Sequence, residues 1–178
     1  MSGTSADERW GTLDAPHRTV RFSRRFAHPI DRVWVTVTDP VQLAAWFPQR
    51  VVGDLPTPGA PLRFESTTGD HAPFEGSVVD ADPPHRVGFT WGSDVIRFEL
   101  EPAGEGCVFV LTDEVDALGH AARDAAGWHT CLDFLAAHLD GADPSFTTVE
   151  RWTEVHPHYV EGFGPEASTI GPPDSFGE

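Results

Sequence analysis

The sequence contains no lysine and no asparagine, and only two of its 178 residues are cysteines. The absence of lysine excludes Schiff-base chemistry through a lysine side chain. Cys107 and Cys131 lack CxxC or similar spacing, so we expect reduced thiols in a cytosolic protein. Isoleucine occurs only at positions 30, 96 and 170. Because lysine, asparagine and isoleucine have A/T-rich codons, a GC-rich bacterial genome accounts for this bias.

Long apolar runs and clustered positive charges are also missing. No stretch approaches the roughly 18 apolar residues that span a bilayer. Residues 1–9 lack the basic start and apolar core of a signal peptide. The formal net charge is −16, and all 12 lysine-plus-arginine positions are arginines spread along the chain. Nucleic acid and anionic membranes attract clustered cations, so we expect neither as a partner and place the protein in the cytoplasm.

Hydrophobic periodicity predicts an α+β domain. A strand at residues 20–26 precedes two short helices, the second of which begins after Asp39 as its cap. Residues 49–113 alternate apolar and polar side chains as a meander of short strands. A long helix is predicted at residues 121–139, with one apolar stripe. The economical arrangement is an antiparallel sheet of about six to seven strands curled around that C-terminal helix.

One strand of this meander, at residues 107–112, is apolar on both faces. Period-2 alternation therefore does not decide which of its side chains point toward the core.

The residues after position 141 lie beyond this predicted core. Thr147 and Glu150 have the spacing of a capping box. Trp152, Val155 and Tyr159 could form one face of a helix, although the sequence also contains a proline at position 157 that would interrupt it.

These patterns divide the chain into three parts. The core domain covers residues 10–141. An extension at 142–163 is expected to form a short broken helix, lying on the domain or in a dimer contact. The Gly-, Pro- and Ser-rich segment 164–178 is expected to be a disordered tail.

Three tryptophan-bearing segments follow one another in a specific order. Asp39-Pro40 leads to Trp46-Phe47-Pro48, Glu75-Gly76 leads through residues 82–90 to Trp91, and Gly127-Trp128 opens the apolar stripe of the long helix. In this order the segments resemble the START-like, or Bet v 1-like (SRPBCC), superfamily. The most similar branch is the single-domain bacterial type named after the C-terminal domain of the Hsp90 ATPase activator.

The resemblance covers residues 10–141 and implies a helix-grip fold. It also implies a cavity between sheet and long helix, which members of the family commonly use for apolar molecules. The side chains expected to line this cavity are mostly aromatic and aliphatic. They are Trp34, Phe64, Phe74, Phe89, Trp91, Phe98, Phe109, Trp128, Cys131, Leu132 and Leu135.

The sequence gives little indication of a metal site or of catalytic residues. The nine histidines show no ligand spacing such as HExxH, so no metal and no cofactor is predicted. Arg97, Thr112 and His129 could supply polar groups to the cavity, but are interpreted as surface residues. His120 and Asp124 form an i, i+4 pair that is interpreted as surface decoration. No catalytic residue is assigned.

Three functions remain open at this point. The leading hypothesis is non-catalytic binding of a small apolar or aromatic molecule in the cavity. The first alternative is a protein-interaction or co-chaperone-like module, which would act through a protein partner or as a homodimer. The second is an aromatase- or cyclase-like enzyme, which would need oriented polar groups in a cavity whose predicted lining is nearly all apolar.

Overall fold

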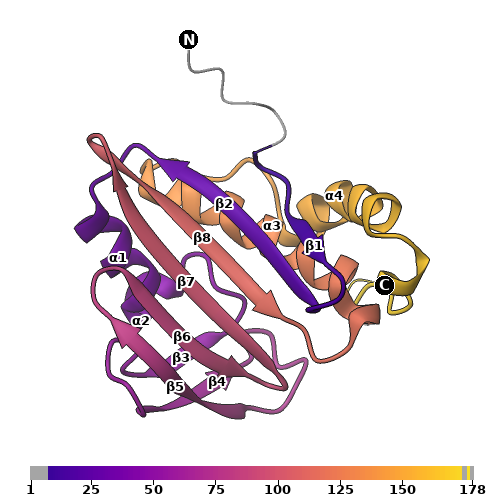
Figure 1. The fold of residues 1–178 in the computed structure, drawn as a ribbon, viewed down its shortest axis with the longest axis horizontal. Coiled ribbons are helices and arrows are strands. Elements are labelled where there is room, and N and C mark those ends of the chain that lie inside the picture. The colour runs from indigo at the N-terminus through magenta and orange to yellow at the C-terminus, as the bar shows by residue number, and fades with distance from the viewer. Residues whose placement is uncertain (1–7, 174–175, 177–178) are drawn as a thin grey trace.

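The computed structural model describes residues 8–173 and 176. One curved antiparallel sheet of eight strands, in the order β1-β2-β8-β7-β6-β5-β4-β3, forms one layer of the fold (Figure 1). The strands are β1 (Thr12–Asp14), β2 (Thr19–Phe26), β3 (Arg50–Gly53), β4 (Pro61–Glu65), β5 (Phe74–Asp82), β6 (Arg86–Trp91), β7 (Asp94–Ala103) and β8 (Gly106–Glu114).

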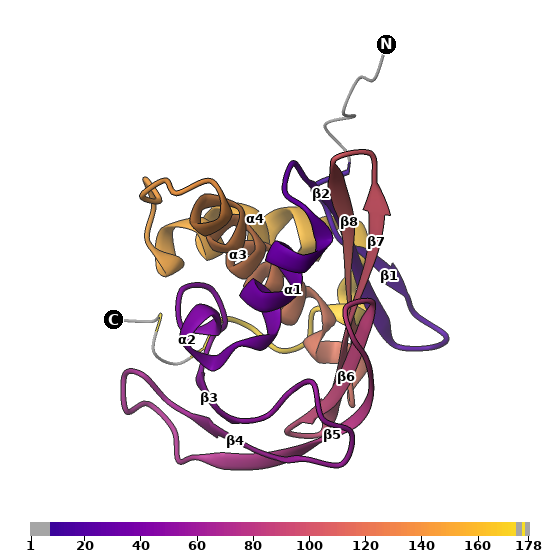
Figure 2. The same ribbon diagram turned by 90° about the vertical axis from the view of Figure 1, so that its left-hand side faces the viewer.

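The helices form the second layer. Figure 2 shows the α-helices on the concave side of the curved sheet. They are α1 (Ile30–Thr38), α2 (Pro40–Leu43), α3 (Ala121–Leu139) and α4 (Thr148–Phe163), with 3-10 turns η1 (Leu118–His120) and η2 (Pro165–Ala167). Among the described residues, no helix combines the length and apolar character needed to cross a membrane.

The helix-grip prediction is confirmed, with one difference in the strand count. The sheet has eight strands instead of six to seven, because two short segments pair at its edges. At one edge β1 pairs with β2, and at the other β3 pairs with β4. Strands of three and four residues carry too little alternation to be identified from sequence alone.

Local sequence signals explain where several elements begin and end. The side chain of Asp39 accepts a hydrogen bond of 3.0 Å from the backbone N–H of Val41, and Pro40 occupies the first turn of α2. Gly92 and Gly104 adopt φ of 60° in the two-residue turns that join β6 to β7 and β7 to β8. This left-handed conformation is readily available only to glycine, so both hairpins follow directly from the sequence.

The structure resolves the orientation of β8. Cys107, Phe109, Leu111 and Asp113 are buried, whereas the side chains between them are only partly buried. Pairing with β7 sets this register, since Leu111 lies opposite Phe98, which is also fully buried. The alternation places a carboxylate, that of Asp113, at the end of an otherwise apolar inward-facing row.

The interior between the sheet and α3 is filled with aromatic rings. Phe47, from the segment after α2, inserts between the two layers: its ring centroid lies 6.1 Å from that of Phe64, 6.2 Å from Phe89 and 5.7 Å from Trp128. All four side chains are at most 6% exposed. Burial of each large side chain contributes about 1.5–3 kcal/mol, so this cluster stabilises the contact between the layers.

The extension differs from the short broken helix that the sequence predicts. The capping box is present, with Thr147 and Glu150 each bonded to the other's backbone N–H. However, α4 runs continuously for 16 residues through Pro157. Proline removes one backbone hydrogen bond, but the buried side chains of Trp152 and Tyr159 lie on either side of it and anchor the helix to the domain.

The segment after α4 also differs from the expected disordered tail in its described part. Residues 165–167 form η2, Ala167 is buried, and the N–H of Ile170 donates to the carbonyl oxygen of Gly119. The ring of Phe176 lies 5.4 Å from that of Trp152 in an edge-on arrangement. Apolar contacts to the domain therefore order a segment whose composition alone suggests disorder. Residues 174, 175, 177 and 178 lie outside the described residues.

Candidate functional site

The eleven candidate cavity residues fall into two groups in the structure. The protein has a larger and a smaller pocket beside α3, and eight of the candidates line neither. These eight lie in the packed interior: Trp34, Phe64, Phe89, Phe98, Phe109, Trp128, Leu132 and Leu135. The other three border a pocket. Cys131 lines the larger one, and Phe74 and Trp91 line the smaller one. The space expected between sheet and long helix is therefore occupied largely by side chains of the protein itself.

The larger pocket has a volume of about 690 Å³ and lies beside α3. Its walls come from the segment after α2, the loop between β4 and β5, four residues of α3, the first turn of α4 and the C-terminal segment. The apolar part of the lining includes Phe134, Val149 and Phe176, and the polar part includes Thr68, Thr130 and Arg123. The remaining lining residues are Ala44, Ala45, Trp46, Phe47, Pro48, Gln49, Ser66, Thr67, Asp70, His71, Cys131, Thr148 and Pro173.

The smaller pocket has a volume of about 440 Å³ and adjoins the larger one. Gln49, His71 and Arg123 line both, so together the pockets form one groove along the mouth between sheet and α3. Trp91 donates a hydrogen bond of 2.9 Å from Nε1 to Oε1 of Gln49, which holds an aromatic wall at the junction. The remaining residues of the smaller pocket are Phe74, Gly92, Ser93, Asp94, Asp116, Ala117, His120 and Asp124.

Three carboxylates meet at the smaller pocket. Asp94 begins β7, Asp113 lies near the end of β8, and Asp124 lies in the first turn of α3. One carboxylate oxygen of each lies within 4.8 Å of one from the other two. Asp94 and Asp124 line the pocket, whereas Asp113 is completely buried. We call these three residues the acidic cluster.

The environment of the acidic cluster disfavours negative charge. Burial, followed by repulsion from Asp94 and Asp124, raises the pKa of Asp113 well above its ordinary value. Burial also raises the pKa of Asp94, and burial together with the charge of Asp94 raises the pKa of Asp124 to about 7. Arg123 partly opposes the shift of Asp124. Carboxyl groups with such raised pKa values in a pocket are typical of functional sites.

Hydrogen bonds fix two members of the acidic cluster. Nε1 of Trp128 donates to Oδ2 of Asp113 at 2.8 Å, and the backbone N–H of Asp116 donates to Oδ1 of Asp94 at 2.9 Å. The second oxygen of Asp113, Oδ1, is buried without a hydrogen-bond partner. The indole of Trp128, expected only as an apolar lining group, thus orients a buried carboxylate.

Sequence reasoning missed this cluster and treated Asp124 as surface decoration. One signal was available. If Phe109 and Leu111 face the core, strict period-2 alternation places Asp113 on the same side. The second face of this strand is also apolar, and that ambiguity hid the signal. The contacts with Asp94 and Asp124 depend on strand pairing and helix packing, which no local pattern specifies.

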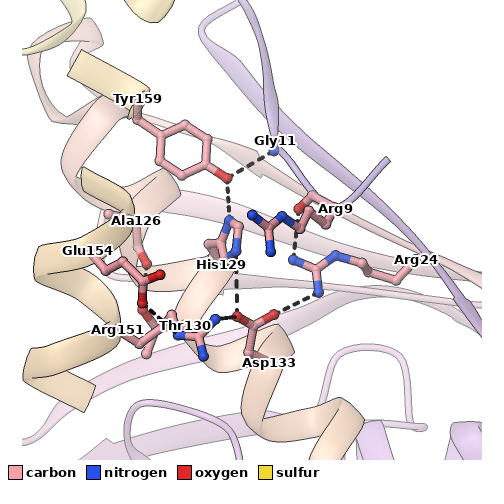
Figure 3. A network of polar contacts seen from close by, with 10 residues as sticks. All are labelled: Arg9, Gly11, Arg24, Ala126, His129, Thr130, Asp133, Arg151, Glu154 and Tyr159. Atoms are coloured by element: carbon pink, nitrogen blue, oxygen red, sulfur yellow. Dashed lines mark hydrogen bonds and ion pairs between the residues drawn. The ribbon is translucent and has the colours of Figure 1, made fainter. Parts of the chain in front are cut away.

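A second polar group lies inside the domain, around His129 of α3 (Figure 3). Nδ1 of His129 lies 2.7 Å from the hydroxyl of Tyr159, which also accepts a hydrogen bond of 3.0 Å from the N–H of Gly11. Nε2 of His129 lies 3.5 Å from Oδ2 of Asp133. The carboxylate of Asp133 also pairs with Arg24 of β2 at 3.0 Å.

The expectation that His129 lies on the surface is wrong, since only 1% of its side chain is exposed. Asp133 also accepts a hydrogen bond of 2.9 Å from Arg151 of α4, so the network joins β2, α3, α4 and the residues before β1. His129 and Tyr159 line neither pocket. We therefore assign this network to holding α4 against the domain.

The chain matches one known protein family. Residues 27–140 match the family described as Activator of Hsp90 ATPase homolog 1-like protein. The chain belongs to this family. The START-like assignment made from the three tryptophan-bearing segments is thereby confirmed, and the match ends within one residue of the C-terminus of α3. Comparison with curated proteins finds no match.

Solved structures with the same fold extend the comparison of this Hsp90-activator-like domain. CalU16 from Micromonospora echinospora is 23% identical, with a TM-score of 0.66 over 83% of this chain and 89% of that chain. A protein of Bordetella parapertussis, encoded by gene BPP1335, is 24% identical, with a TM-score of 0.64 over 92% and 93%.

DynU16, a putative protein in the dynemicin biosynthetic locus, is 27% identical, with a TM-score of 0.63. The match covers 74% of this chain and 50% of DynU16. The family match supports a ligand-binding domain in general terms, and these neighbours show the fold.

Proposed function

We propose that this protein binds a small molecule with an apolar or aromatic body, without transforming it, in the groove formed by the larger and smaller pockets. The observation that carries the proposal is the pair of adjoining pockets, of about 690 and 440 Å³, at the mouth between sheet and α3. Binding sites for small molecules typically enclose about 300–1,000 Å³. The groove replaces the interior as the binding site, because Phe47 and its neighbours fill the space beneath α3.

The lining indicates what kind of molecule fits. Phe134 and Phe176 offer apolar surface at one end, and Phe74 and Trp91 offer aromatic surface at the other. Hydroxyl, amide and guanidinium groups lie between these ends, with Arg123 and Gln49 in both linings. The larger pocket is mostly apolar, whereas the smaller one also carries Asp94, Asp116 and Asp124, so the groove suits a ligand of mixed character, whose polar substituents set its orientation. The place of a 27% identical relative in a biosynthetic locus is compatible with such a role.

The first experiment is a comparison of native and denaturing mass spectra of the purified full chain. A non-covalent adduct of constant mass and near-unit stoichiometry supports the proposal and gives the mass of the ligand. Binding of a neutral aromatic dye, Nile red, is measured in parallel by its fluorescence increase, because it requires no knowledge of the natural ligand.

Two alanine-to-tryptophan variants locate the site. Ala45 is exposed and lines the larger pocket, so Ala45→Trp fills the groove without disturbing the core. Ala142 is equally exposed but lines neither pocket, so Ala142→Trp is the matched control. We expect Ala45→Trp to weaken dye binding at least about tenfold, equivalent to about 1.4 kcal/mol, and Ala142→Trp to leave it unchanged. Equal binding by both variants, without any adduct in the wild type, contradicts the proposal.

The acidic cluster favours a second candidate function, acid–base catalysis on the bound molecule. A carboxyl group with a pKa of about 7, as for Asp124, is suited to donate or accept protons near neutral pH. The two candidates differ in the fate of the ligand. A binding protein returns the molecule with unchanged mass after prolonged incubation, whereas an enzyme converts it. In the second case Asp124→Asn abolishes conversion while dye binding persists.

A further inference from the structure

We propose that Asp94, Asp113 and Asp124 bind a divalent metal cation, of the class of Mg²⁺, Ca²⁺ or Mn²⁺, at the base of the smaller pocket. One carboxylate oxygen from each lies within 4.8 Å of one from the other two. In a six-coordinate site with bonds of about 2.1–2.4 Å, ligand oxygens are separated by roughly 3 to 4.8 Å. The three oxygens therefore lie at separations that one ion can bridge.

Asp113 provides an independent reason to expect a ligand. Its side chain is completely buried, and Oδ1 accepts no hydrogen bond from a donor group of the protein, so without an ion the carboxyl gains a further partner only by sharing a proton with Asp94. A buried oxygen without a donor is unfavourable, because it has lost its hydrogen bonds to water and has gained none from the protein. Trp128 donates to the other oxygen, Oδ2, and so orients the carboxylate. In metal sites, hydrogen bonds from neighbouring groups to the ligating carboxylates hold these ligands in place.

The cluster is accessible from one side. Asp94 and Asp124 line the smaller pocket, and Asp113 lies behind them in the core. An ion entering from the pocket would contact all three carboxylates on its inner side and keep water on its outer side. Mg²⁺ and Ca²⁺ commonly retain water molecules in this way. The donor set consists only of oxygens, which matches hard cations better than zinc or copper.

The surrounding charges also favour a cation. Besides the acidic cluster, the charged or titratable residues lining the smaller pocket are Asp116, His120, His71 and Arg123. Arg123 is the only side chain with a fixed positive charge in that lining, against three carboxylates at the wall and one beneath it. Three close carboxylates in a partly buried site repel one another strongly. A divalent ion bound by one oxygen of each residue removes this repulsion and gives the buried carboxylate of Asp113 a positively charged partner.

The test uses the full chain, treated with EDTA and dialysed to pH 8 in about 0.15 M NaCl. At this salt concentration the non-specific attraction of cations to the net charge of −16 is screened. Mn²⁺ and Ca²⁺ are titrated by calorimetry. Tryptophan fluorescence provides a second readout, because the indole N–H of Trp128 is bonded to Asp113 and paramagnetic Mn²⁺ quenches nearby indoles. We expect saturable binding of one ion per chain and quenching that follows the same isotherm.

Two isosteric substitutions test the assignment. Asp124→Asn removes one proposed ligand, whereas Asp116→Asn removes the same charge from the same pocket but lies outside the acidic cluster. We expect Asp124→Asn to weaken Mn²⁺ binding by more than about tenfold, and Asp116→Asn to weaken it by less than about threefold. Asp94→Asn is a second ligand variant, since its amide oxygen can still accept the hydrogen bond from the N–H of Asp116.

Either of two results overturns the proposal. The first is the absence of saturable Mn²⁺ and Ca²⁺ binding to the folded wild type at millimolar concentrations. The second is equal weakening by Asp124→Asn and Asp116→Asn, which would show diffuse electrostatic attraction. The proposal does not depend on the organic ligand, because it is tested with the metal ions alone.

Discussion

The hydroxyl of Tyr159, on the helix that follows the family domain, lies 2.7 Å from Nδ1 of the buried His129 on α3. This contact joins α4 to the part of the chain that matches the family. The same hydroxyl accepts a hydrogen bond from Gly11, so one side chain also fixes the residues that enter the sheet. The extension is therefore an integral part of the domain.

Removing this hydroxyl should destabilise the protein. Tyr159→Phe leaves the N–H of Gly11 and Nδ1 of His129 unpaired in the interior, so we expect a loss of about 1–3 kcal/mol in the free energy of unfolding, measured with urea. Val160→Ala is the control, because Val160 is the next residue on α4 and is 37% exposed. Its effect should stay within about 0.5 kcal/mol. A Tyr159→Phe variant as stable as the wild type would show that the network does not hold α4.

Acid should weaken the same network. Burial lowers the pKa of His129, with partial opposition from Asp133. The unfolded chain therefore takes up a proton below about pH 6.5 before the folded protein does, and stability falls as the pH drops below that value. We expect a loss of up to about 1.4 kcal/mol per pH unit from this group, seen in urea unfolding between pH 7 and 5. His129→Gln should flatten that slope, and an unchanged slope would contradict the assignment.

The acidic cluster should have the opposite pH dependence. Burial and the charge of Asp94 raise the pKa of Asp124 to about 7, from 3.8. Between about pH 4 and pH 7 the folded protein therefore holds more protons than the unfolded chain. The free energy of unfolding falls as the pH rises across this interval. In EDTA, Asp124→Asn should be more stable than the wild type at pH 8 by about 1–3 kcal/mol, and nearly equal at pH 4. A constant difference across this range would show that Asp124 has an ordinary pKa.

Overpacking tests whether the interior is filled. Phe98 is fully buried, with the rings of Phe89 and Phe109 at 5.5 and 5.4 Å. Phe98→Trp adds volume there and should destabilise the protein by about 1–3 kcal/mol in urea unfolding. Val41→Trp makes a comparable addition at a side chain that is 78% exposed, and should have little effect. If Phe98→Trp is tolerated as well as the control, the interior contains a void that can accept a larger ring.

Much of the fold could be predicted because its signals are local. Helix α3 follows from the apolar stripe of Trp128, Leu132, Leu135 and Leu139, all at most 2% exposed. The hairpin turns follow from glycines that adopt positive φ. The persistence of α4 through Pro157 could not be predicted in this way, because the contacts that offset the lost hydrogen bond come from residues outside the helix, such as Gly11, which bonds Tyr159, and Asp133, which pairs with Arg151.

By itself, the amino-acid sequence determined the family, the α+β class and the faces of most strands, since periodicity, caps and turns act over a few residues. Tertiary structure alone decided which residues form the groove and the acidic cluster, on which the two proposed sites rest. Phe47 closes the interior from a segment some 80 residues before Trp128, and the acidic cluster is assembled from two strands and a helix. Such groupings depend on strand register and on the packing of the layers, and these are properties of the whole chain.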